Sequence, residues 1–262
     1  VLRGILAADQ VGFHLYEYAR HFMTTCHRLL GHGSDMSPNG NLSISVDDRE
    51  VVISCIHVGI DLPRLRGIME EDAFPSRVQV WSKKYSDRKI VASVDRLERL
   101  KGIPLKLKAI DLFLSKNPDW LGKIAFALIG ISAIERGDDY RITQTEVAAA
   151  VKGLNSKYGK TAGTEGPVVW YEERHERNFG LKSRLEFFAA ADILMVTATR
   201  DGLNRFPLEF TIARNRVGQL ALEKQGVSIS DLKLDAPVGN GLVVISEFIS
   251  SARVMRGALT VN

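Results

Sequence analysis

The fold is decided by the stretch Ile90-Val-Ala-Ser-Val-Asp-Arg-Leu-Glu-Arg-Leu-Lys-Gly-Ile-Pro104. Its first part, Ile90 to Val94, is a short apolar run of the kind that forms a buried strand. Pro104 suits the first turn of a helix, and Gly102, two residues earlier, marks the junction between loop and helix. The sequence therefore predicts a strand, a charged loop and a helix in direct succession.

The same rhythm continues along the rest of the chain, where short apolar runs alternate with helical stretches. This alternation indicates βαβ units and a parallel sheet buried on both faces. Because such crossovers are right-handed, the expected fold is α/β, a doubly wound, Rossmann-like parallel sheet. The predicted strands are 90–94, 124–131, 168–171, 193–197, 242–245 and 258–261. The predicted helices are 104–115, 139–157, 181–191, 206–215 and 247–254.

The N-terminal segment has a different pattern. Apolar residues at helical spacing predict an amphipathic helix over 15–30, followed by a polar loop. Two short strands, 42–46 and 51–56, flank a turn at Asp47-Asp48. The stretch from Gly59 to Pro63 breaks the pattern and is a candidate linker. We therefore expect two domains, 1–62 and 63–262, and a surface insertion over 216–240, where no periodicity is visible.

Composition narrows the class of protein. The chain has 262 residues, 45% of them apolar, with 35 lysines and arginines against 31 aspartates and glutamates. These values are typical of a globular protein, and no block of basic residues indicates nucleic acid as a partner. No run approaches the about 18 apolar residues that would cross a bilayer, so no membrane partner is expected either. Neither end has the pattern of a natural terminus, and we expect a piece of a larger protein.

Two cysteines, Cys26 and Cys55, are too few for a disulfide framework. They indicate a reducing compartment, so a cytoplasmic location is expected, with both thiols buried among apolar neighbours. The six histidines show no metal-binding spacing, and no metal or other cofactor is expected.

The polar residues after each predicted strand are the candidates for function, because ligands of doubly wound sheets bind beyond the carboxyl ends of the strands. Arg96 and Lys101 follow the first of these strands and precede a helix N-terminus. Two cations beside free backbone N–H groups suit a diphosphate. A solvated loop rich in charge explains the same residues, and spacing alone leaves both interpretations open.

Two other strand ends carry candidate residues. Arg136 follows the strand 124–131, where an exposed arginine is uninformative by itself. After the strand 193–197, Asp201-Gly-Leu-Asn204 is a turn signal and Pro207 suits a helix start. Glu209, in the first turn of that helix, suits sugar hydroxyls, and interaction with the helix dipole is the alternative.

Several motifs resemble those of the trehalose-6-phosphate synthases, and together they extend over nearly the whole chain. The stretch Val94 to Pro104 closely resembles the donor-site motif of that family. The other matching motifs are Arg200-Asp-Gly-Leu-Asn204 with Glu209, Ser246-Glu-Phe248 with Gly257 to Asn262, Gly12-Phe-His14, Tyr18 to Phe22, and Val58 to Asp61. They follow the family's order along the chain.

The resemblance implies a retaining glycosyltransferase of the GT-B type with two Rossmann-like lobes. Residues 1–62 resemble the end of the acceptor lobe, and 63–262 resemble most of the donor lobe that binds the nucleotide sugar. The family transfers glucose from UDP-glucose to glucose 6-phosphate, giving trehalose 6-phosphate and UDP, with no metal, cofactor or enzyme nucleophile. Some members carry a fused phosphatase domain, so the full-length protein is a candidate for one.

The resemblance also assigns roles to individual residues. Arg96 and Lys101 match the pair that grips the donor diphosphate. Asp201 matches the residue that holds the glucose hydroxyls in that family, together with the backbone of Gly202, Leu203 and Asn204. The ribose hydroxyls are assigned to Glu209, and the acceptor to Arg136 and His14.

One stretch departs from the family. Arg205, Phe206 and Pro207 stand where the family has small and basic residues, and Pro207 removes a backbone N–H donor. Two alternatives therefore stay open beside an active synthase. One is a non-catalytic sugar-nucleotide-binding or regulatory module, since a fold can persist without its chemistry. The other is a retaining GT-B transferase with a different acceptor.

Overall fold

The computed structural model describes residues 1–36, 40–85, 88–132, 137–159, 166–224, 241–255 and 257–261. The chain divides into two compact units, Val1–Gly59 and Ile60–Asn262, where the sequence predicts a boundary at residue 62. Each unit has its own hydrophobic core and is described by itself.

The larger unit is built on a parallel sheet. Among the described residues this sheet has six strands in the order β10-β9-β8-β5-β6-β7, and every neighbouring pair is parallel. Its strands are β5 (Lys89–Arg96), β6 (Ile124–Ser132), β7 (Val169–His175), β8 (Ile193–Val196), β9 (Leu242–Ser246) and β10 (Leu259–Val261). Numbered along the chain, this is the 3-2-1-4-5-6 order of dinucleotide-binding folds, with a reversal between β5 and β8. The predicted strands and the doubly wound α/β class are confirmed.

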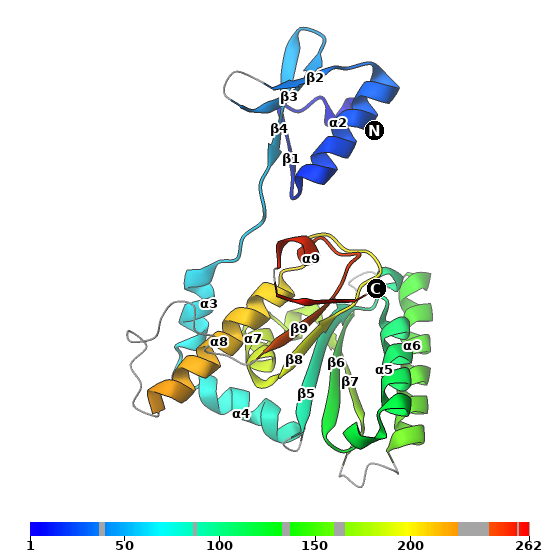
Figure 1. The fold of residues 1–262 in the computed structure, drawn as a ribbon, viewed down its shortest axis with the longest axis vertical. Helices are drawn as coiled ribbons and strands as arrows, with labels where there is room; N and C mark the ends of the chain where they lie inside the picture. The colour runs from blue at the N-terminus through cyan, green and yellow to red at the C-terminus, as the bar shows by residue number, and fades with distance from the viewer. Residues whose placement is uncertain are drawn as a thin grey trace. The chain divides into compact units, whose positions relative to one another are not determined.

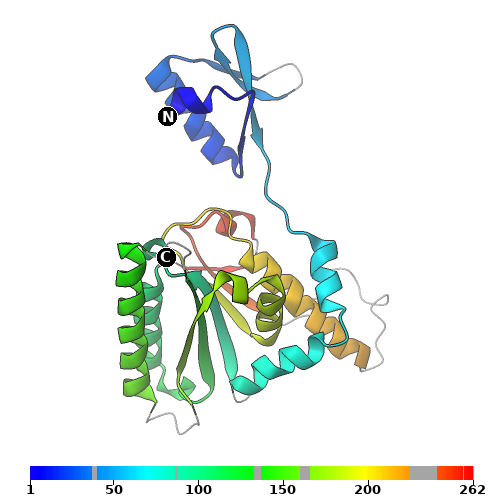
Figure 2. The same cartoon turned by 180° about the vertical axis from the view of Figure 1, so that it is seen from behind.

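Helices cover the two faces of this sheet (Figures 1 and 2). One layer consists of α5 (Ile103–Lys116) and α6 (Asp138–Tyr158), and the other of α3 (Leu62–Met69), α4 (Phe74–Lys84), α7 (Leu181–Ala190) and α8 (Phe206–Lys224). Side chains of β5 alternate between the two cores, so that Ile90 and Ala92 join the α7 side and Val91 joins the α5 side. The middle of this strand is mostly apolar because both of its faces are covered.

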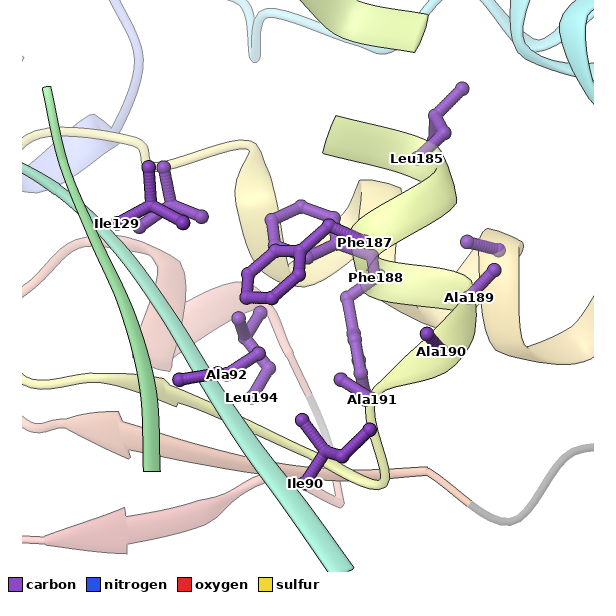
Figure 3. Close-up of a cluster of buried hydrophobic side chains, with 14 of the residues drawn as sticks. Ile90, Ala92, Ile129, Leu185, Phe187, Phe188, Ala189, Ala190, Ala191 and Leu194 are labelled. Carbon is purple, nitrogen blue, oxygen red and sulfur yellow. The ribbon is translucent and has the colours of Figure 1, made fainter. Parts of the chain in front are cut away.

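The core between α7 and the sheet contains the largest aromatic cluster. Phe187 and Phe188 of α7 are fully buried, and Figure 3 shows them facing Ile90 and Ala92 of β5 and Leu194 of β8. Burying one such ring stabilises the fold by about 1.5–3 kcal/mol. Helix α7 also packs against α4 and α8, so it is enclosed on nearly every side.

The smaller unit combines a sheet with helices. Its sheet has the order β1-β4-β3-β2, in which β1 and β4 are parallel and the other pairs antiparallel. The elements are α1 (Leu2–Ile5), β1 (Gln10–Phe13), α2 (Tyr16–Leu30), β2 (Ser34–Met36), β3 (Leu42–Val46) and β4 (Arg49–Cys55). Helix α2 shares its core with β3 and β4. The predicted helix and hairpin are confirmed, and Asp47 forms the turn with a φ of 51°.

Several elements differ from the prediction. Strand β2 lies in the predicted polar loop, and α3 and α4 occupy a stretch for which the sequence analysis assigned no helix. Helix α4 has a proline in its first turn and buries only Phe74 and Trp81, so its apolar stripe is narrow. The predicted helix over 247–254 is wrong except for the short α9 (Ser251–Val254). Cys26 is buried as expected, whereas Cys55 is exposed.

The insertion predicted over 216–240 is only partly described. Helix α8 continues to Lys224, past the predicted end at 215, and 225–240 lie outside the described residues. A single interior glycine such as Gly218 costs a helix about 1 kcal/mol and does not end it. In the part of the chain that the structure describes, we find no helix with the length and apolar character needed to cross a membrane.

Candidate functional site

The candidate site lies where the order of the strands reverses. Strands β5 and β8 are neighbours in the sheet, yet α5 follows β5 on one face and α8 follows β8 on the other. The loops beyond the two strands diverge there and leave a crevice at their carboxyl ends. A cavity of about 180 Å³ at this point is lined by Val94, Asp95, Arg96, Lys101, Asp201, Asn204 and Phe206. Four residues predicted from the sequence, namely Arg96, Lys101, Asp201 and Asn204, thus come together.

Backbone contacts hold the two loops of the site against each other. The N–H groups of Thr199 and Arg200 donate to the carbonyl oxygen of Leu100, at 3.0 and 3.3 Å. Gly102 has a φ of +63°, and a Cβ at this position would meet the Thr197 carbonyl oxygen at 3.1 Å. Only glycine combines this left-handed backbone with so close an approach. The Gly102 turn therefore fixes Lys101 beside the loop that carries Asp201.

Asp201 organises its loop through its carboxylate. Its Oδ2 lies 2.8 Å from Lys101 Nζ and accepts a hydrogen bond from Asn204 Nδ2 at 3.2 Å. Its Oδ1 accepts from the Gly202 N–H at 2.9 Å. Asn204 Oδ1 in turn accepts from the Phe206 N–H at 2.9 Å, which begins α8. Leu203 is half-buried within this loop.

Arg96 is the last residue of β5, and its side chain is exposed to solvent. Its side chain is 54% exposed, with one guanidinium nitrogen 3.1 Å from Glu176 Oε1 and another 4.0 Å from Glu98 Oε1. Exposed ion pairs of this kind contribute about 0–1 kcal/mol, so a ligand anion can replace them. The N-terminus of α5, which begins after Gly102, lies on the same side of the loop and adds free N–H groups and its dipole. Together these groups form an anion-binding arrangement.

A buried charge cluster behind Arg96 was missed by the sequence analysis. Lys106 of α5 has no exposed side-chain surface, and its Nζ lies 2.5 Å from Asp95 Oδ2. Ser93 Oγ donates to the same oxygen at 2.5 Å, and Lys106 also donates to Ser93. Because Asp95 directly precedes Arg96, this cluster ties the end of β5 to α5. The one available signal was a carboxylate placed inside an apolar strand.

Glu209 lies deeper than the sequence suggests. It is 3% exposed and is not among the described residues that line the cavity. Its two carboxylate oxygens accept hydrogen bonds from Arg184 of α7, at 2.6 Å from Nε and 3.0 Å from a terminal nitrogen. The sequence analysis did not single out Arg184.

The structure tests neither of the two residues predicted at the acceptor. Arg136 falls in 133–136, outside the described residues. His14 belongs to the smaller unit, where it is exposed and its Nδ1 lies 3.4 Å from the Ile56 carbonyl oxygen. The acceptor roles of both residues stay predictions.

A larger cavity of about 480 Å³ lies against the α5 face of the sheet. Its lining is mostly aliphatic and aromatic, from α5, β5, β6, β8 and β9, and its one titratable side chain, Lys106, is already paired with Asp95. A charged ligand requires fixed cations, so the smaller cavity is the better candidate. Over the described ranges we find no cluster of three or more histidine, cysteine, aspartate or glutamate side chains placed to hold a metal ion.

A doubly wound sheet of this order, with an anion-binding crevice at its switch point, defines the class as a Rossmann-like nucleotide-binding fold. The chain belongs to glycosyltransferase family 20, whose family model matches residues 1–262.

Two curated relatives illustrate the similarity. The chain is 28% identical over 264 residues to alpha,alpha-trehalose-phosphate synthase (UDP-forming) 2 of Aspergillus niger, covering 100% of this chain and 48% of that protein. It is 32% identical over 262 residues to alpha,alpha-trehalose-phosphate synthase (UDP-forming) 5 of Arabidopsis thaliana, covering 100% of this chain and 29% of that protein. The chain thus spans about half or less of the length of these relatives.

Solved structures share the fold. The N-terminal domain of Candida albicans trehalose-6-phosphate phosphatase matches with a TM-score of 0.79 and 23% identity, over 100% of this chain and 48% of that one. A Burkholderia xenovorans alpha,alpha-trehalose-phosphate synthase (UDP-forming) in complex with glucose-6-phosphate also gives 0.79, at 19% identity, over 100% and 51%.

Proposed function

We propose that the chain is the donor-binding part of a retaining glucosyltransferase that moves glucose from UDP-glucose to glucose 6-phosphate, forming trehalose 6-phosphate and UDP. The observation that carries the proposal is the convergence of Arg96, Lys101 and Asp201 on one cavity at the switch point of the sheet. The names of the relatives support it, since both are UDP-forming trehalose-phosphate synthases.

In this proposal each group has a defined task. The bond between the glucose anomeric carbon and the UDP oxygen breaks, and a bond from that carbon to the acceptor oxygen forms on the same face. The leaving phosphate takes the acceptor's proton, so no enzyme nucleophile is required. Arg96 and Lys101 stabilise the charge that develops on the leaving UDP, and losing one such contact typically costs about 3–4 kcal/mol of transition-state stabilisation. Asp201 and the Gly202–Asn204 backbone orient the glucose.

Further parts of the proposal concern the whole protein. Residues 1–62 would belong to the acceptor lobe, with His14 and Arg136 near glucose 6-phosphate. The Candida match is to a domain of a protein named as a phosphatase, which supports a fused phosphatase domain in the full-length protein. A cytoplasmic location is proposed on the small number of cysteines.

Calorimetric titration of the chain with UDP tests the donor site. We expect UDP affinity to fall at least about tenfold in Arg96→Ala and in Lys101→Ala, since each removes a charge-assisted contact. Arg99→Ala is the matched control, because it removes the same charge from an exposed side chain of the same loop that does not line the cavity. A folded chain that binds no nucleoside diphosphate would overturn the proposal.

A second candidate is a non-catalytic sugar-nucleotide-binding or regulatory module. Two observations favour it: the same fold forms the N-terminal domain of a protein named as a phosphatase, and Pro207 interrupts the N–H donors at the start of α8. Incubating the full-length protein with UDP-glucose and glucose 6-phosphate separates the two candidates. Release of UDP with formation of trehalose 6-phosphate supports the synthase, whereas tight donor binding without turnover of any acceptor supports the module.

A further inference from the structure

The motif Ser246-Glu-Phe248 has no task in the proposed function, although it lies at the same edge of the sheet as the candidate cavity. Strand β9 ends at Ser246 and runs parallel to β8, which in turn runs parallel to β5. The carboxyl ends of parallel strands meet at one edge of a sheet. The β9–α9 loop, residues 247–250, is therefore a third loop beside those that carry Lys101 and Asp201.

The β9–α9 loop contacts the Asp201 loop through the backbone. Asp201 and Ile249 form an isolated parallel bridge outside the six strands. The Ile249 residue is only 1% exposed and belongs to the core on the α7 side of the sheet. Because a close-packed core residue moves little, this bridge anchors the backbone of Asp201. The bridge does not by itself orient the Asp201 carboxylate.

A side-chain hydrogen bond from α9 provides that orientation. Ser251, the first residue of α9, is 1% exposed, and its Oγ donates to the Asn204 carbonyl oxygen at 2.8 Å. Asn204 Nδ2 in turn donates to Asp201 Oδ2 at 3.2 Å. A buried hydroxyl requires a hydrogen-bond partner, and Asn204 provides one across 47 residues of sequence. Ser251 therefore fixes Asn204, and Asn204 holds the Asp201 carboxylate.

The cations proposed for the diphosphate are supported by other contacts. Lys101 follows Leu100, whose carbonyl oxygen accepts from two backbone N–H groups of the β8–α8 loop at 3.0 and 3.3 Å. Arg96 is the last residue of β5, which pairs with β6 along its whole length. Neither of these contacts involves Ser251. The groups proposed for the sugar and those proposed for the diphosphate are thus held in place independently.

We infer that Ser251 is a positioning residue for the transferred sugar: through Asn204 it fixes the Asp201 carboxylate, and it leaves the diphosphate cations unaffected. This inference rests on the proposed donor site at Arg96, Lys101 and Asp201. The ligand class is a nucleoside diphosphate sugar, and Ser251 governs recognition of its sugar alone.

Calorimetric titration of the chain with UDP and UDP-glucose tests the inference. In Ser251→Ala the affinity for UDP-glucose should fall at least about fivefold, because the Asp201 carboxylate loses its fixed orientation, whereas the affinity for UDP should stay within about twofold. Ser132→Ala is the matched control, because Ser132 is also buried and donates to a backbone carbonyl oxygen of another element, yet does not line the cavity. It should change neither affinity by more than about twofold.

A double-mutant cycle tests the route through Asn204. Asn204→Ala removes the amide that holds Asp201, and it should also lower the affinity for UDP-glucose at least about fivefold. If Ser251 acts through this amide, adding Ser251→Ala to Asn204→Ala should lower the affinity by less than about twofold more. Two losses that multiply would mean that Ser251 acts by another route, and that result overturns the inference.

The two ligands also separate positioning from a merely structural role. An equal loss for UDP and UDP-glucose in folded Ser251→Ala, or no loss for either, would show that Ser251 does not position the sugar site. If this variant fails to fold, Ser251→Cys keeps the size of the side chain but is a weaker donor, and it should lower the ratio of UDP-glucose to UDP affinity at least about threefold. An unchanged ratio there overturns the inference.

Failure of the proposed function gives a different result. A folded, unaltered chain that binds neither UDP nor UDP-glucose would overturn the donor site, and this inference with it. Binding of both ligands to every variant with unchanged affinities would leave the donor site standing and overturn only the role of Ser251.

Discussion

Lys101 Nζ lies 2.8 Å from Asp201 Oδ2, so the cation proposed for the donor diphosphate and the carboxylate proposed for the transferred glucose hold one another. The two side chains are 18% and 19% exposed, which makes the pair less screened than a surface pair. In the proposed function, a donor that binds both groups competes with this pair. A sugar nucleotide would give each group a new partner, whereas UDP alone would give one to the lysine and leave Asp201 with only the Gly202 N–H and Asn204.

This pairing predicts opposite effects on two ligands. In Asp201→Asn the lysine is released in advance, so UDP affinity should rise by about threefold to tenfold. UDP-glucose affinity should fall by a similar factor, because an amide is a weaker acceptor for the glucose hydroxyls. The asparagine oxygen can still accept from the Gly202 N–H, so the loop should keep its shape. Titration of both ligands into the same preparation checks the prediction.

Asp119→Asn is the control for this experiment. It makes the same chemical change at an exposed position outside the cavity lining and should leave both affinities unchanged. A change of the same sign for UDP and UDP-glucose in Asp201→Asn would mean that the Lys101–Asp201 pair does not oppose donor binding.

The sheet was predictable from sequence because its strands are buried on both faces. Ile90 to Val94 is apolar except for Ser93, and Ile124 to Ile131 has no polar side chain, a pattern that a half-exposed surface helix does not show. Helix α4 was missed for the opposite reason: most of its residues are exposed or half-buried, and only Phe74 and Trp81 are buried. The predicted helix over 247–254 was wrong because residues 247–250 form a turn, and only Ser251–Val254 are helical.

Site residues could be predicted from the sequence where they lie at the carboxyl end of a strand, because the direction of the strands then determines their position. Arg96 ends β5 and Asp201 comes after β8, and the carboxyl ends of parallel strands meet at one edge of the sheet. Lys106 and Arg184 were missed because a charged residue in a helix is usually solvated, and their partners lie on other elements. Nothing in the sequence pattern indicated that Glu209 is buried against Arg184, because that contact depends on the packing of α7 against α8.

Gly102→Ala should loosen the site and the fold together. The residue has a φ of +63°, and an added Cβ would lie 3.1 Å from both the Thr197 carbonyl oxygen and Thr199 Cγ2. We expect a loss of about 1–2 kcal/mol in the free energy of unfolding, from the left-handed backbone alone, and weaker UDP binding because Lys101 moves. Urea unfolding and calorimetry measure the two effects.

Gly153→Ala is the matched control, because Gly153 lies in the exposed interior of α6 with open space around its Cα. It should raise the free energy of unfolding by about 0.5–1 kcal/mol and leave UDP binding unchanged. Equal effects of the two substitutions on stability would contradict the role assigned to the Gly102 turn.

Lys106→Met should be among the most destabilising single changes in the larger unit. It leaves Asp95 buried without its cation, which typically costs about 3–5 kcal/mol. Adding Asp95→Asn should recover part of that loss, because the remaining buried group is neutral and can bond to Ser93. Guanidinium unfolding of the single and double variants measures the difference.

Lys108→Met is the control, because Lys108 is exposed on the same helix. It should change the free energy of unfolding by less than about 0.5 kcal/mol. A loss comparable to that of Lys106→Met would count against the buried pair.

The ion pairs of Glu71 predict a contribution to the free energy of unfolding that is lost in acid. Its Oε2 lies 2.6 Å from Lys182 Nζ of α7 and 2.7 Å from a terminal nitrogen of Arg77 of α4. Hydrogen bonds from Lys182 and then Arg77 hold the pKa of this carboxyl below its ordinary value of 4.5. Since the folded-state pKa is depressed, the contribution is fully present above the unfolded value and is lost as the pH falls through the folded one.

Glu71→Gln should therefore unfold at a lower temperature than the unaltered chain at pH 7, because the amide cannot form either ion pair. The difference in Tm should shrink as the pH falls below about 4.5 and vanish once Glu71 is protonated in the folded state. Asp72→Asn, the exposed neighbour, should give a small difference at every pH. Thermal unfolding from pH 7 to pH 3 measures both variants, and a Glu71→Gln difference that stays constant over this range would mean that the carboxylate does not tie α4 to α7.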